Sequence, residues 1–145
     1  MNGMIVELRP VATTEYQTVL RSVGHFLAAR QLAPTAEAFV QQVQPWPQNT
    51  ASIMQQGIRV VTYAPPASAD PRIVTAPLIN ELSFQRADRV PLWLVVVLVG
   101  QDSTRQPEFI QLVQRLTNPQ AAQELHQLPP SLLTAAMRRM MVRDA

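Results

Sequence analysis

Hydrophobic residues recur at helical spacing in the first third of the chain. The spacing of three and four residues predicts one buried helical face, made of Tyr16, Val19, Leu20, Val23 and Leu27. Thr14 and Gln17 stand three residues apart, as in a capping box, so we expect a helix over about 15–31. A second helix is predicted over about 36–43, and it ends at Pro45–Pro47 because proline has no backbone N–H to donate.

The middle of the chain has the pattern of strands. Residues 4–9 predict a short strand or an entry segment, and the polar segment 48–57 predicts turns. Residues rich in β-branched side chains predict a strand over 58–63. Shorter strands are expected at 73–76 and around 82–84, after a proline-rich loop at 64–71. The eight residues 92–99 are all apolar, which is typical of a strand covered on both faces.

The last third of the chain predicts three helices. An apolar stripe at helical spacing follows Pro107, which stands at a first-turn position, and extends to Leu116. Asn118 and Pro119 predict the start of a helix that ends near residue 127, and a last helix is expected over 132–142. We therefore expect one α/β domain over 1–145, with a mixed sheet sandwiched between helices.

Composition excludes several classes of site. The 145 residues suit one domain, and 47% of them are hydrophobic, enough for a sizeable core. The absence of cysteine excludes disulfides, thiolate metal sites and cysteine nucleophiles. Two isolated histidines, His25 and His126, do not have the spacing of a zinc site, so we expect no metal and no cofactor.

The high sequence pI of about 9.9 does not indicate a strongly basic surface. The net charge is only +2, and all 12 basic residues are arginine, so almost nothing titrates between pH 7 and 10. A net charge this small is poor evidence for nucleic-acid binding. It also leaves little electrostatic repulsion between copies, so we expect some self-association into homo-oligomers.

The longest apolar run is far shorter than the roughly twenty residues of a membrane-spanning helix. The first residues lack the basic head and apolar stretch of a signal peptide. From the sequence we therefore predict a soluble cytoplasmic protein with no membrane insertion.

The order of these elements resembles the enzyme IIA (EIIA) component of the sugar phosphotransferase system (PTS), of the fructose–mannitol–galactitol type. The best local match joins Pro91–Asp102 to Glu108–Leu116, a core strand followed by a polar turn and a helix. Asn118–Leu125 resembles the next helix of that family, and Thr50 with Gly57–Thr62 resembles its active-site segment. The resemblance covers nearly the whole chain and implies an EIIA type 2-like fold.

The sequence departs from this family where phosphate is transferred. The family accepts phosphate on the histidine of a Pro-His pair, but this chain has Val61-Thr62 there. The family's Arg-Glu pair corresponds to Gln44-Pro45-Trp46, and its second histidine corresponds to Glu108. Thr62 therefore stands at the position of the phosphoacceptor, with Thr50, Arg59 and Glu108 as the residues expected around it.

Threonine does not replace histidine chemically. A phosphoimidazole passes its phosphate on readily, whereas a threonine phosphate is an ordinary ester and a poor donor. Thr62 would also need a nearby base to act as a nucleophile. We expect His25 to be a partly buried helix residue and His126 to end a helix, so neither supplies that base.

Three other features have two interpretations each. Arg59 either holds an anion or faces away from the site as an edge residue. Trp46 either contacts a partner or covers the core. The last amphipathic segment, with Met137, Arg138 and Met140, either docks on the core of the domain or contacts a partner or a membrane surface.

Three functions are consistent with the sequence. The first is a degenerate EIIA-like domain that acts in regulation or protein binding without histidine phosphotransfer. The second is a working EIIA phosphocarrier that takes phosphate from the carrier protein HPr and passes it to a sugar-specific EIIB. The third is an unrelated α/β domain that binds a small molecule. The resemblance implies HPr, EIIB or a regulator protein as partner for the first two.

Overall fold

The computed structural model describes residues 5–7, 16–46, 50–66, 71–82, 92–101 and 105–141. In chain order the elements are β1 (Ile5–Glu7), α1 (Tyr16–Ala29), α2 (Ala36–Gln42), β2 (Gln44–Pro45), α3 (Thr50–Gln55), β3 (Ile58–Tyr63), β4 (Arg72–Leu82), β5 (Leu92–Val99), α4 (Pro107–Leu116), α5 (Pro119–His126) and α6 (Pro130–Met141).

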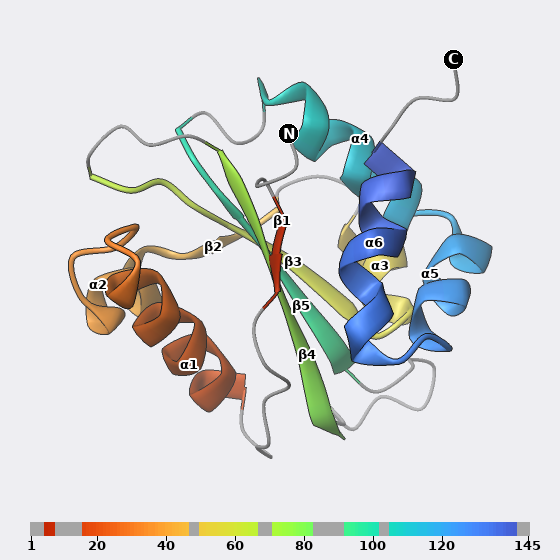
Figure 1. Ribbon diagram of the computed structural model, residues 1–145, viewed down its shortest axis with the longest axis horizontal. Coiled ribbons are helices and arrows are strands. Elements are labelled where there is room, and N and C mark those ends of the chain that lie inside the picture. The colour runs from red at the N-terminus through yellow and green to blue at the C-terminus, as the bar shows by residue number, and fades with distance from the viewer. Residues whose placement is uncertain are drawn as a thin grey trace.

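Within the described residues, five strands form one mixed sheet in the order β1-β4-β5-β3-β2. β5 runs parallel to β3 and antiparallel to β4. β1 is parallel to β4, and β2 is antiparallel to β3. Figure 1 shows α1 and α2 on one side of this sheet, with α3, α5 and α6 on the other. The expected mixed sheet between helices is confirmed.

β5 lies at the centre of the sheet and is buried along its whole length. Val95, Val97 and Val99 pack into a core with α1 and α2. Leu94, Val96 and Leu98 alternate with them and pack into a second core with α3–α6. A strand with two buried faces has no polar position in its pattern, which is why residues 92–99 are continuously apolar.

The structure differs from the sequence predictions in two places next to β3. Residues 50–55 form the short helix α3, although their polar sequence had indicated turns. Among the α3 side chains that the structure describes, Ile53 alone is in the core, so this short helix has no visible helical period in its sequence. Gln44–Pro45, predicted to be only a helix stop, also pairs with β3 as an edge strand.

The two short strands expected at 73–76 and near 82–84 are one strand up to Leu82. The pairing of β4 with β5 is irregular between Pro77 and Leu82, because proline cannot donate to the ladder. Position 84 lies outside the described residues. At the N-terminus the described strand is Ile5–Glu7, within the predicted 4–9.

Gly57 joins α3 to β3 with a positive φ of 79°. Glycine adopts this conformation without a Cβ clash, so the chain can reverse in one step from helix to strand. The Gly57 carbonyl then accepts a hydrogen bond from the Trp93 backbone N–H at 2.8 Å. The turn thereby fixes the start of β3 against the start of β5.

The close approach of α1 to α2 depends on Gly24. A Cβ atom built on Gly24 would lie 2.8 Å from the carbonyl oxygen of Ala36 and 3.0 Å from its Cα. Both atoms belong to the backbone and cannot rotate away. The first turn of α2 therefore packs directly on the backbone of α1.

We expect Gly24→Ala to destabilise the protein, by about 1–3 kcal/mol, because α2 must move away. At an ordinary helical position the same change would stabilise by up to about 1 kcal/mol. The free energy of unfolding from urea denaturation measures the effect. Gln41→Ala, at an exposed position of α2, is the control and should change stability by less than about 0.5 kcal/mol. A stabilised Gly24→Ala variant would contradict the close approach.

Thr75 on β4 is fully buried, and its hydroxyl has no hydrogen-bond partner. We expect Thr75→Val to stabilise the protein by about 1 kcal/mol, because it removes an unsatisfied polar group at nearly constant shape. Thr75→Ser, which keeps the hydroxyl and loses a methyl group, should destabilise. Urea denaturation compares the three proteins, and a destabilised Thr75→Val would indicate that the hydroxyl is satisfied.

Candidate functional site

The candidate site lies at the carboxyl ends of the parallel strands β3 and β5. The Gly100 N–H donates to the Tyr63 carbonyl at 3.0 Å, just after both strands end. The Gln101 side-chain amide donates to the Pro65 carbonyl, and Gln106 Nε2 donates to the Gln101 carbonyl at 3.2 Å. These bonds hold the segments after both strands next to the start of α4. Such an edge is where α/β sheets most often bind ligands.

Thr62 stands one residue before the end of β3. By strand alternation its side chain shares a face with Ile58 and Val60, which pack toward α3–α6. It is half-buried, and its hydroxyl donates to the Gln44 carbonyl at 3.4 Å. Beside it is a small hollow of about 200 Å³, lined by Gln42, Gln44, Thr62 and Ala64. This lining contains no ionisable side chain, so the hollow offers hydrogen bonds without formal charge.

Arg59 lies on the opposite face of β3 from Thr62. Alternation places it with Val61 and Tyr63, toward α1. Its guanidinium carbon lies 4.8 Å from the centre of the Tyr16 ring, a cation–π contact at the start of α1. The structure therefore does not bring Arg59 and Thr62 together. The expected anion-binding role of Arg59 stays a prediction.

Glu108 is in the first turn of α4, at the same sheet edge as Thr62. It is half-buried, and its carboxylate has no hydrogen bond or ion pair with the described residues. Thr50 is the first residue of α3, but its side chain lies outside the described part of the chain. The roles expected for these two residues therefore stay predictions.

The two histidines of the chain lie away from Thr62. His25 is exposed on α1, so the expectation that it is partly buried is wrong: it points away from the stripe that covers the sheet. α1 also covers the opposite face of the sheet from Thr62. His126 is the last residue of α5, and its predicted place at a helix end is confirmed.

His126 stacks on Trp93 with a ring-centre distance of 4.3 Å and an interplanar angle of 5°. The Trp93 indole N–H donates to the Gln56 carbonyl at 2.9 Å, which orients the ring. Trp93 lies five positions before Leu98, the partner of Thr62 in the sheet. At roughly 3.3 Å per residue this is about 16 Å along the strand, far beyond proton transfer.

Trp46, two residues after Gln44, is buried in the core of the α3–α6 face, so it covers the core. Met137 is buried in the same core and Met140 packs against it, which places α6 on the domain itself. The sequence had left both alternatives open. The stacking of Trp93 on His126 had no signal in the sequence, since 33 positions separate the two residues.

Among the described residues, no three side chains of His, Cys, Asp or Glu come close enough to bind a metal ion together. The helices in the same ranges lack the length and hydropathy needed to cross a bilayer.

No protein-family model matches this sequence, and no curated protein matches it. The fold itself is of the PTS EIIA type. The chain is structurally similar to the nitrogen regulatory protein IIA-Ntr from Neisseria meningitidis, with a TM-score of 0.61. The similarity covers 94% of this chain and 93% of that one, at 9% sequence identity, so what the two share is the fold.

Both tyrosines of the chain pack against the α1 face of the sheet. Burial raises the pKa of Tyr16, and the Arg59 guanidinium partly offsets this. Burial also raises the pKa of Tyr63, whose hydroxyl has no hydrogen-bond partner and whose ring meets Phe39 edge-on at 5.2 Å. Each phenol therefore stays neutral in the folded protein at a pH where it would ionise in an unfolded chain.

This arrangement predicts a loss of stability in alkali. A folded-state pKa above the unfolded value of about 10 means that the unfolded chain loses its proton first, so stability falls as pH rises above about 10. The chain has no lysine or cysteine, so the two phenols dominate this range. Urea denaturation between pH 8 and 11 measures the slope. Tyr16→Phe should reduce the slope, and an unchanged slope would contradict the assignment.

Proposed function

We propose that this protein is a degenerate EIIA-like domain that acts by binding a partner in regulation, without relaying phosphate through histidine. The observation that carries the proposal is the position of the two histidines. One lies on the far face of the sheet and the other at the opposite end of β5 from Thr62. The edge where phosphate transfer would be expected therefore has no imidazole.

The chemistry of Thr62 supports the same conclusion. Its hydroxyl hydrogen is directed to the Gln44 carbonyl, a backbone group that cannot accept a proton as a base. The hollow beside it offers amides, which neither activate an alcohol nor neutralise a phosphate charge. A phosphorylated Thr62 would also be a stable ester. The residues of this edge favour hydrogen bonding over group transfer.

The fold supports a partner from the PTS. A likeness over 94% of the chain argues against the third hypothesis, an unrelated domain with an accidental resemblance. The solved neighbour is a nitrogen regulatory protein, and this favours a regulatory role for the present chain. We infer that HPr, a sugar-specific EIIB or a regulator protein contacts the carboxyl edge of β3 and β5. This assignment favours a regulatory function over sugar transport of the fructose–mannitol–galactitol type. We also propose a cytoplasmic location for the protein.

The proposal predicts that the protein does not accept phosphate. We would incubate it with phosphoenolpyruvate, enzyme I and HPr and measure its intact mass. No mass increase is expected, because no residue at the site can form a transferable phosphoimidazole. An active EIIA protein in the same reaction is the positive control. A stoichiometric addition of one phosphate would contradict the proposal, and its acid lability would distinguish a histidine from a threonine.

Thr62→His provides a matched variant in the same assay. It should remain unphosphorylated, because the arginine and the second histidine of the family site are also missing. Efficient labelling of this variant would mean that the rest of the site is functional.

A further inference from the structure

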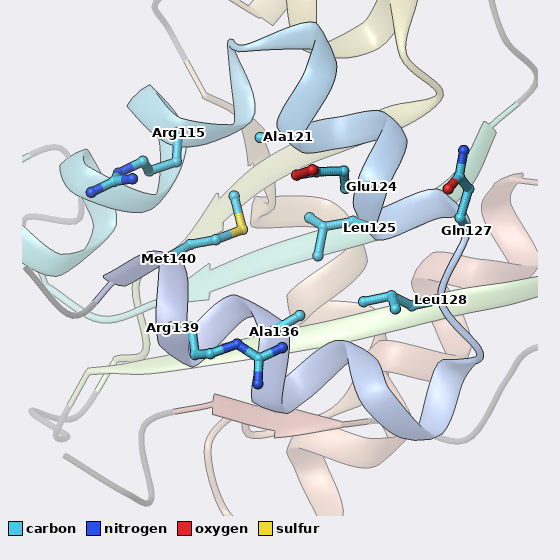
Figure 2. A pocket seen from close by; sticks show the side chains of 9 residues that line it. All are labelled: Arg115, Ala121, Glu124, Leu125, Gln127, Leu128, Ala136, Arg139 and Met140. Atoms are coloured by element: carbon cyan, nitrogen blue, oxygen red, sulfur yellow. The ribbon is translucent and has the colours of Figure 1, made fainter. Parts of the chain in front are cut away.

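A second cavity lies away from the candidate site, between the last three helices. It is a groove of about 590 Å³ formed by α4, α5 and α6. Figure 2 shows its lining side chains on all three helices and on the connection between α5 and α6. Arg115, at the far end of α4 from Glu108, lies about 10 Å along the helix from that residue. The groove is therefore distinct from the hollow beside Thr62.

The floor of the groove is apolar and continues into the core. Leu125 and Ala136 are buried members of the core on the α3–α6 face. Leu128 and Met140 are half-buried and pack against that core, so part of each side chain remains in contact with water. Methionine adapts its shape readily to an apolar partner. An apolar chain laid in the groove would remove these surfaces from water.

The rim of the groove is charged, with a positive excess. Arg115 and Arg139 contribute two guanidinium groups, and Glu124 contributes one carboxylate. None of these three side chains forms an ion pair or hydrogen bond with another described residue. In Figure 2 the Arg139 guanidinium lies beside Ala136, and the Glu124 carboxylate lies on the other side of the groove, toward Met140. The positive charge and the apolar floor therefore meet on α6.

We propose that this groove binds an amphipathic carboxylate, with its apolar chain over Leu125, Leu128 and Met140 and its head group at Arg139. The volume is within the range of about 300–1,000 Å³ that small-molecule sites occupy. A guanidinium matches a carboxylate with two parallel N–H groups. The Glu124 carboxylate repels the ligand carboxylate. The ligand is therefore expected to lie with its head group at Arg139 and its apolar chain toward Glu124. The inference is independent of whether the protein accepts phosphate.

Decanoate, below its micelle concentration, is the probe, and equilibrium dialysis measures its binding. Saturable binding to one site is expected, with weaker binding of decanol and of decyltrimethylammonium, which have the same chain but lack the carboxylate. Arg139→Gln should weaken decanoate binding about fivefold. Glu124→Gln should strengthen it, because it removes a like charge. Circular dichroism verifies that each variant is folded.

Arg138→Gln is the matched control, since Arg138 is the neighbouring exposed arginine on α6 and does not line the groove. It changes the net charge equally and should leave decanoate binding unchanged. The proposal is wrong if decanoate does not bind saturably, if the three probes bind equally, or if Arg138→Gln weakens binding as much as Arg139→Gln. Weaker binding by Glu124→Gln would also overturn it, since this would indicate recognition of a positive group.

Discussion

The burial of β5 on both faces is the constraint on which the rest of the structure depends. Its eight residues are all apolar and all buried, so the sheet is stable only with a helical layer on each side. The α1–α2 pair covers one face and α3–α6 the other. At the carboxyl ends of β3 and β5 this covering is incomplete, since Thr62 is half-buried and Gln101 is exposed. The position of the candidate site follows from that geometry.

This arrangement separates the requirements of the fold from those of the site. The core residues on β3 and β5 lie along the strands, whereas Thr62, Gln44 and Glu108 lie at the carboxyl edge of the sheet. A change of residue at the edge removes a chemical group and leaves both cores in place. A chain can therefore keep the fold of a solved neighbour at only 9% sequence identity.

Elements with a strong hydrophobic pattern could be predicted from the sequence, and elements without one could not. β5 and α4 agree with their predicted bounds, since each contributes a full stripe or face to the core. α3 was missed because, of its described side chains, Ile53 alone enters the core. The edge strand β2 was missed because two residues define no period. In both cases contacts with β3, which a local pattern does not contain, determine the structure.

The candidate site was less predictable than the fold, for a related reason. Alternation along β3 already implies that residues 59 and 62 face opposite sides, but only the two cores show which side α1 covers. The contact of Arg59 with Tyr16 then follows, and it gives Arg59 a partner on the α1 face. The stack of Trp93 and His126 is likewise a product of the fold, because it joins a strand start to a helix end. Both contacts assign a structural environment to residues whose chemical type alone suggests a reactive role. Residue type and spacing identify the candidate residues, and the packing of helices on the sheet determines which of their side chains come into contact.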